Sequence, residues 1–438
     1  MNKQILRLAI PNIISNLSVP LLGAVDTALV GHLEATFYIG AVAVGTMIFN
    51  VVYWGFGFLR MGTTGLTAQA YGREDRSDQI LTLARAVLVA LGGGLLLVTL
   101  QRPIAQLAFW LVDGTPDVET YARSYFLIRI WAAPATLCIY AFQGWFLGMQ
   151  NARYPMYLVV FVNLANVCFD LLFIKVFAMK SDGAALGTVV AAWMGLGLAL
   201  VLFSRTYRPL LVHLERRLIL QFAALERFFA VNRDITIRTL ALVFSYSFFT
   251  AKSAELGETT VAVNSILMQF WMIMAYAVDG FAFAAEGLVG RYVGAGDSAN
   301  LRRAVKLSFL WGTGFGVLFA LVYLALDRQL LSIFTDKPDL IEIALQFYPW
   351  ILIGTIINVF CYIWDGVYIG ATATKPMVFS MILSTGVGFL LTYYLTIGSL
   401  GNHALWLAMT LFMALRGITL TLYAPRAIFA PLKSAIQD

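Results

Sequence analysis

Long apolar runs recur along the whole chain, and this recurrence constrains the fold more than any other feature of the sequence. Short breaks that carry charges, glycine or proline separate the runs. In lipid, all backbone N–H and C=O groups must be bonded within the protein, so uninterrupted runs of this length are expected to be helical. The sequence predicts twelve spans, at residues 8–31, 36–68, 78–100, 121–149, 156–178, 183–204, 233–251, 259–289, 301–325, 341–369, 376–397 and 401–424.

The composition supports an all-α polytopic membrane protein. Of the 438 residues, 60% are hydrophobic and only 12% are charged, whereas soluble proteins carry about 25% charged residues. So few charges cannot cover the surface of a soluble protein of this size. The composition therefore excludes a cytosolic enzyme, a disordered scaffold and a nucleic-acid binder, although the formal net charge is +6.

Lys and Arg gather in every second break, which predicts the orientation of the chain. Basic pairs such as Arg73 and Arg76, or Arg302 and Arg303, alternate with breaks that carry few basic residues. Cytoplasmic loops of membrane proteins are enriched in Lys and Arg. Both termini are therefore predicted to be cytoplasmic, as an even number of spans requires.

The sequence also divides into two similar halves. We predict an N-lobe of helices 1–6 at residues 1–204, a linker at 205–232 with a short amphipathic helix in LILQFAALERFF, and a C-lobe of helices 7–12 at 233–438. Parallel repeats of this kind are typical of transporters with a substrate path between the halves. At one constant offset in residue number, Gly72 matches Gly294, Asp75 matches Asp297, Pro116 matches Pro338, Tyr140 matches Tyr362 and Gly144 matches Gly366.

Polar residues inside the predicted spans of the first half suggest an ion-coupling site. Asp26, Asp170 and Thr188 lie on three different spans, roughly 8–12 Å from the outer helix ends at 1.5 Å per residue. Asn166 lies one turn from Asp170 on the same helix face. Charged residues in membrane spans are costly and usually functional.

Two carboxyl groups in one low-dielectric pocket cannot both stay ionised cheaply, so at least one of Asp26 and Asp170 is expected to hold a proton near neutral pH. The same oxygens, with Asn166 and Thr188, could instead coordinate Na⁺. Two structural alternatives also remain: the carboxylates pair with a neighbouring helix, and Thr188 bonds back to its own helix.

Three acids of the second half form a second candidate set. Asp279, Glu286 and Asp365 fall in the inner half of the membrane, where Asp279 is a candidate contact for cationic cargo. Glu286 and Asp365 lie near helix ends and suggest a water-filled vestibule, with Arg416 available to pair with one of these acids.

Pro20 interrupts the first span on the cytoplasmic side of Asp26. A proline inside a helix removes one hydrogen bond, so this span either carries a fixed kink or bends when Asp26 changes protonation.

Enzyme motifs are absent from the sequence. The chain has no Gly-Lys pair and therefore no phosphate-binding loop, and its three histidines are scattered across separate breaks. No catalytic set, cofactor or metal site is expected, apart from the alternative of Na⁺ in the first half.

Several segments resemble the multidrug and toxic compound extrusion (MATE) family, in its DinF branch. They are LAIPNIISNLSVPLLGAVDTALVGHL, FLRMGTTGLTAQAYG, QGWFLGMQNARYP, NRDITIRTL, AYAVDGFAFAAEGLVG, CYIWDGVYIGAT and GNHALWLAMTLFMALRG. The resemblance implies twelve helices in two six-helix lobes arranged as a V. It also implies a coupling role for Asp26, Asn166, Asp170 and Thr188, and drug export in exchange for H⁺ or Na⁺.

These observations predict a proton-coupled multidrug antiporter of the bacterial inner membrane. Its expected partners are small organic, cationic or amphipathic substrates and membrane lipids, and a monomer is expected. The alternatives are a Na⁺-coupled antiporter of the same fold and, from the wider superfamily, a flippase for lipid-linked precursors. The flippase is disfavoured because the deep charges of the second half read as mostly acidic. A membrane-embedded enzyme is disfavoured by the missing catalytic set.

Overall fold

The computed structural model describes residues 1–31, 36–112 and 115–430, without the side chains of residues 19, 21–31, 36 and 227. All regular structure in these ranges is helical, as the sequence predicts. Ten helices of the described part are long and apolar enough to cross a membrane. The first and seventh predicted spans, 8–31 and 233–251, lie within the longer helices α1 (Asn2–Gly31) and α11 (Phe222–Glu255), which have 30 and 34 residues.

Some of the other predicted spans are not continuous α-helices. The second predicted span is two helices because a turn at Gly55–Gly57 separates them, and the eleventh passes through a π-helical stretch at Ser384–Leu391. The helices are α2 (Thr36–Gly55), α3 (Phe58–Gly72), α4 (Arg76–Thr99), α5 (Gln101–Leu111), α6 (Pro116–Arg129), α7 (Ala133–Gly148), α8 (Arg153–Asp170), α9 (Lys180–Tyr207), α10 (Arg216–Ile219), α12 (Glu258–Gly294), α13 (Ser298–Ala325), α14 (Asp327–Ser332), α15 (Pro338–Gly370), α16 (Thr374–Leu383), α17 (Thr392–Leu400) and α18 (Asn402–Ala424).

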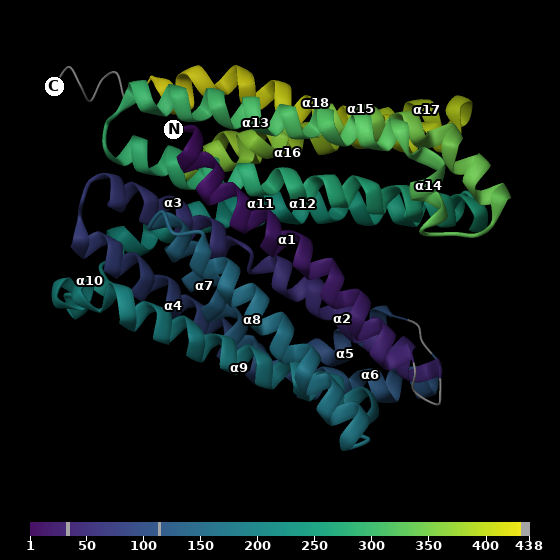
Figure 1. Cartoon of the computed structure of the whole chain (residues 1–438), viewed down its shortest axis with the longest axis horizontal. Helices are drawn as coiled ribbons and strands as arrows, with labels where there is room; N and C mark the ends of the chain where they lie inside the picture. The colour runs from purple at the N-terminus through teal and green to yellow at the C-terminus, as the bar shows by residue number, and fades with distance from the viewer. Residues whose placement is uncertain (32–35, 113–114, 431–438) are drawn as a thin grey trace. The chain divides into compact units, whose positions relative to one another are not determined.

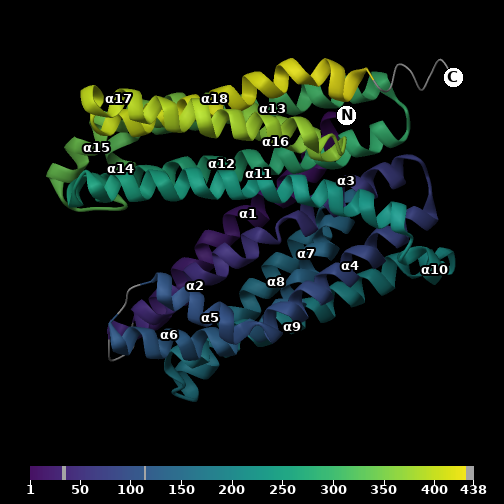
Figure 2. The ribbon, with the colours of Figure 1, turned by 180° about the vertical axis from the view of Figure 1, so that it is seen from behind.

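The chain separates into two compact units (Figure 1). The amino-terminal unit is Ile14–Phe229, and the carboxy-terminal unit combines Met1–Ile13 with the chain from Ala230 onward. In the carboxy-terminal unit α12 packs most extensively on α15, and α13 and α18 flank α15, as the two opposite views show (Figure 2). In the amino-terminal unit α7 packs on α3 and α4, and α8 packs on α9.

The two halves repeat each other in backbone conformation at the constant offset that the sequence predicts. Glu74 has a φ of 58° and its counterpart Gly296 a φ of 68°, and each ends the turn after a long helix. Gln150 and Thr372, which the same offset relates, have φ values of 63° and 53°. Left-handed conformations are uncommon for residues other than glycine, so their recurrence at one offset is strong evidence for a structural repeat.

The helix that follows the first of these turns is capped in the same way in both halves. Asp75 accepts a hydrogen bond from the backbone N–H of Asp78, and Asp297 accepts one from that of Asn300, both at 2.9 Å. Each carboxylate thereby bonds one of the N–H groups that a helix start leaves unsatisfied. The aspartates that match in the sequence therefore have one structural role.

Glycines bring two helices into backbone contact in each half. A Cβ placed on Gly144 of α7 would lie 2.2 Å from the carbonyl oxygen of Arg60 in α3. A Cβ on Gly366 of α15 would lie 2.1 Å from the carbonyl oxygen of Ala282 in α12. The offset that relates the two glycines also relates Arg60 to Ala282. The same close helix packing, which small residues allow in membranes, therefore occurs once inside each unit.

The prediction of a separate amphipathic helix in the linker is wrong. From Phe222 the chain already belongs to α11, because residues 222–255 contain neither glycine nor proline to end that helix. The linker is reduced to a 3₁₀ segment, Arg208–His213, and the single turn of α10. The buried Arg85 of α4 fixes α10 by donating to the carbonyl oxygens of Leu218 and Ile219, at 2.8 and 3.2 Å.

We expect Gly144→Ala to lower the melting temperature of the purified protein strongly, because its new methyl group would meet a backbone oxygen. Overpacking of this kind typically costs about 1–3 kcal/mol. The control is Gly92→Ala in α4, where nothing lies within 4 Å of the added Cβ. Equal melting temperatures for the two variants would contradict the proposed packing.

Removal of the cap at Asp297 should destabilise the protein in a pH-dependent way. Hydrogen bonds from the Asn300 side chain and backbone lower the pKa of Asp297 below its usual 3.8. The stabilisation is therefore complete above about pH 5 and disappears as the pH falls through the lowered pKa. Asp297→Ala should cost about 0.5–2 kcal/mol at pH 7. Melting curves should show a smaller difference from wild type at pH 3, and an undiminished difference would refute the role of the carboxylate.

Candidate functional site

Asp170 lies where the regular α-helix of α8 ends. The next residues, Leu171–Val176, form a π-helical turn. Such turns inside helices often mark functional sites. Only 1% of Asp170 and 4% of Asn166 is exposed, so α8 places a carboxyl group and an amide together in the interior of the amino-terminal unit.

Three of the four predicted coupling residues are linked through Asn166, which bonds to each of the other two. The Nδ2 of Asn166 donates to Oδ1 of Asp170 at 3.2 Å and to Oγ1 of Thr188 at 3.4 Å. The Thr188 hydroxyl donates to the carbonyl oxygen of Ala184 at 3.0 Å. Thr188 thus bonds back to its own helix and also accepts from the amide. The back-bonded hydroxyl is therefore compatible with membership of the predicted coupling cluster.

A glycine makes room for the carboxyl group between the helices. A Cβ on Gly187 of α9 would lie 2.0 Å from Oδ1 of Asp170. The carboxyl group therefore rests directly against the backbone of α9. Any larger residue at position 187 would displace it, and this explains why the close α8–α9 packing and the buried acid occur together.

The fourth predicted residue, Asp26, is part of α1, but its side chain lies outside the described residues. Pro20 is within the same continuous helix. Two residues before it, Ser18 contacts α8: Nδ2 of Asn163 donates to the Ser18 hydroxyl at 3.1 Å. Asn163 is about one turn before Asn166, so α1 is connected beside Pro20 to the helix that carries the candidate site.

Asp365 of the second candidate set is paired with two arginines. Nη2 of Arg416 in α18 donates to Oδ2 of Asp365 at 2.6 Å, and Nη2 of Arg238 in α11 donates to the same oxygen. Asp365 is 6% exposed, Arg238 7% and Arg416 1%. The prediction of a solvated vestibule at Asp365 is therefore wrong, because the carboxylate is buried as a structural ion pair.

The other two acids of that set are both on α12. Asp279 is half-buried and Glu286 is buried. The burial of Glu286 also contradicts an open, water-filled vestibule. The guanidinium groups that bond Asp365 come from α11 and α18.

Sequence reasoning missed Arg238 and Asn163. Arg238 lies five residues inside the predicted span 233–251, and an arginine at that position is itself a signal for a buried acidic partner. With two arginines on one aspartate, the cluster of Arg238, Asp365 and Arg416 carries a net charge of +1. The expectation that the deep charges of the second half are mostly acidic is therefore wrong for this cluster.

Within the part of the chain that the structure describes, no group of three or more His, Cys, Asp or Glu residues lies close enough to hold a metal ion. The hydrogen-bonded cluster around Asp170 combines an amide, a hydroxyl and a carboxyl group. In this arrangement the side-chain amide of Asn166 connects the carboxyl group of Asp170 on α8 to the Thr188 hydroxyl on α9.

The family model MatE matches residues 11–172 and 235–394, one match in each half. The chain is 39% identical to DNA damage-inducible protein F of Escherichia coli over 96% of this chain and 91% of that protein. It is 24% identical to the probable multidrug resistance protein NorM of Rhizobium meliloti over 88% of this chain and 84% of that one. The Vibrio cholerae MATE transporter VcmN has the same fold, with a TM-score of 0.88, 19% identity and coverage of 99% and 97%.

Neutralising Asp365 should destabilise the protein more than removing either arginine. Asp365→Asn leaves two buried positive charges, whereas Arg238→Gln leaves a balanced pair of Asp365 with Arg416. Breaking a buried ion pair costs about 3–5 kcal/mol when one charge stays uncompensated. Thermal unfolding of the purified variants measures the order, and a more stable Asp365→Asn than Arg238→Gln would contradict it.

Proposed function

Because the chain belongs to the MatE family and is thus a multi-pass membrane transporter rather than an enzyme, we propose that it is a multidrug efflux antiporter driven by proton entry. Its cargo would be small organic compounds, chiefly cationic or amphipathic ones. The name of the NorM relative, a probable multidrug resistance protein, supports this substrate class. The observation that carries the proposal is the buried hydrogen-bonded cluster of Asn166, Asp170 and Thr188.

The orientation of Asn166 favours H⁺ over Na⁺ at this cluster. Its N–H groups, not its carbonyl oxygen, point at Asp170 and Thr188. A Na⁺ ion needs several oxygens directed at it, and here the amide nitrogen takes up a lone pair on Oδ1 of Asp170 and one on Oγ1 of Thr188. A proton needs only the carboxyl group itself. The donors and acceptors thus fit a protonation site better than a cation cage.

Protonation of Asp170 would change the bonds that hold α8 to α9. The ionised carboxylate accepts from Asn166, whereas the protonated form also carries an O–H donor that must find an acceptor. The π-helical turn Leu171–Val176 begins at the next residue. We propose that α8 adjusts at this turn when Asp170 gains or loses its proton.

The adjustment of α8 would reach α1 through the Asn163–Ser18 hydrogen bond and through Asp26. Asn163 bonds Ser18 beside Pro20, where the proline weakens the helix. Asp26 lies six residues after Pro20, as the second carboxyl group of the proposed pair. We propose that α1 bends at Pro20 as the two acids change protonation, and that this bending releases the drug.

Acidic residues of the carboxy-terminal unit would contribute to cargo binding, but fewer of them than the sequence suggests. Asp365 is neutralised by Arg238 and Arg416, so it is excluded as a cargo contact. Asp279 on α12 stays the candidate contact for cationic cargo and Glu286 a weaker one. We also propose a location in the bacterial inner membrane, as a monomer with both termini cytoplasmic.

Transport in proteoliposomes tests the coupling ion. We expect an imposed pH gradient to drive drug flux in the wild type and an imposed Na⁺ gradient alone to drive none. Asp170→Asn and Asp26→Asn should reduce the pH-driven flux to near background, because neither variant can carry the proton. Asp117→Asn is the matched control, since Asp117 is an exposed acid at the start of α6 in the same unit.

Two results would refute the proposal in different ways. Flux that follows the Na⁺ gradient and ignores the pH gradient would replace H⁺ with Na⁺. Full pH-driven flux in Asp170→Asn would remove Asp170 from the mechanism.

A further inference from the structure

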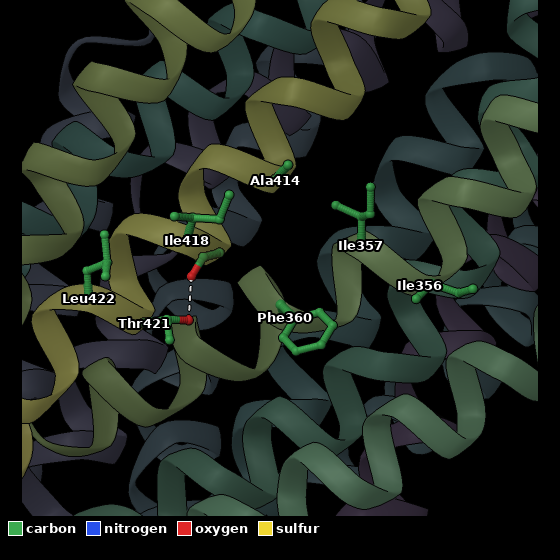
Figure 3. A pocket seen from close by; sticks show the side chains of 8 residues that line it. Ile356, Ile357, Phe360, Ala414, Ile418, Thr421 and Leu422 are labelled. Carbon is green, nitrogen blue, oxygen red and sulfur yellow. Dashed lines mark hydrogen bonds between the residues drawn. The ribbon is translucent and has the colours of Figure 1, made fainter.

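An apolar groove of about 500 Å³ lies between α15 and α18 in the carboxy-terminal unit. Its walls come from both helices, and Figure 3 shows Ile357 and Phe360 of α15 facing Ala414 and Ile418 of α18. Both helices belong to segments long and apolar enough to span the membrane. The complete lining is Ile356, Ile357, Phe360, Ala414, Gly417, Ile418, Thr421 and Leu422.

The groove lies on the outer side of the helix pair that buries the ion cluster. Asp365 and Arg416 lie in the interior between the two helices, while Phe360, Ile418 and Leu422 are 42%, 55% and 72% exposed. Small residues form its floor: at Gly417 an added Cβ would lie 3.2 Å from Cβ of Phe360. The groove therefore opens toward the hydrocarbon around the protein and ends at closely packed helices.

The lining offers no polar atom to orient a drug. Thr421 is the one lining side chain with a polar group. Its hydroxyl donates to the carbonyl oxygen of Gly417 at 2.7 Å, the bond drawn in Figure 3, and accepts from Nε1 of Trp364 at 2.7 Å. Drug sites usually combine apolar walls with a few available polar groups, so this groove fits a plain hydrocarbon chain better.

The length and the end of the groove fit one phospholipid. From Ala414 to Leu422 the helix rises roughly 12 Å at 1.5 Å per residue, and one leaflet supplies about 15 Å of the hydrocarbon core. One turn beyond Leu422 is Arg426, which is exposed in the π-helical turn Pro425–Phe429. Its guanidinium is the group that a phosphate near the membrane surface would contact.

We propose that this groove binds one membrane phospholipid, with an acyl chain along Phe360 and Ile418 and the headgroup phosphate at Arg426. The site is separate from the proposed proton site, which lies in the other unit. A lipid bound here would fill the space between α15 and α18 and stabilise the helix pair that carries Asp365 and Arg416.

Native mass spectrometry of the purified full chain, titrated with dioleoylphosphatidylglycerol, tests this proposal. The wild type should bind one lipid with higher affinity than the remaining lipids. Ala414→Phe, which fills the floor, should lose that lipid, and Arg426→Gln should bind it several-fold more weakly. Leu411→Phe is the matched control, because Leu411 is an exposed residue of α18 outside the groove.

A second pair of variants covers the case in which Ala414→Phe does not fold. Ile418→Asn places a polar group on the exposed wall and should also lose the lipid, whereas Leu411→Asn should keep it. The proposal is overturned if the groove variants bind the lipid as tightly as their controls. It is also overturned if tetraphenylphosphonium displaces the lipid from the wild type, because the groove would then be a drug site. Neither result bears on proton coupling at Asp170.

Discussion

Close backbone contact at glycine is the constraint on which each half of this protein depends. In hydrocarbon, helices gain little from burying apolar side chains against one another, so their association relies on close packing and on interhelical hydrogen bonds. Gly144 and Gly366 let α7 and α15 rest on carbonyl groups of α3 and α12. The same contact recurs at the offset that relates the two halves. It sets the spacing of α3 and α7 in one unit and of α12 and α15 in the other.

The two halves share a backbone but not their buried chemistry. At the offset that relates the two halves, the position equivalent to Asp170 is Thr392, and the position equivalent to Asp365 is Gln143. In the amino-terminal unit Asp170 accepts a hydrogen bond from an amide that also contacts a hydroxyl. In the carboxy-terminal unit Asp365 is fixed by two guanidinium groups. A repeated fold thus holds one carboxyl group that accepts from an amide and one carboxylate that is paired with two arginines.

Much of the fold could be predicted because membrane helices are encoded locally. The start of α12 and the end of α13 each fell within one residue of the prediction, since Gly257 and a charged turn mark them. The separate linker helix was wrong, because an amphipathic stretch does not show whether the next helix continues through it. Asn166, Asp170 and Thr188 could be grouped from depth and helix periodicity alone. Arg238 was missed because its partner lies far away in the chain, on α15.

The sequence by itself determined the membrane class, the helices, the repeat and the residues of the amino-terminal cluster, because apolar length and spacing along one helix are properties of neighbouring residues. Only the tertiary structure decided which donor faces which acceptor. It showed that the amide nitrogen of Asn166 faces Asp170, that Gly187 makes room for that acid, and that two arginines neutralise Asp365. These facts depend on helices that approach from distant parts of the chain, and no local pattern records how side chains meet across such a contact.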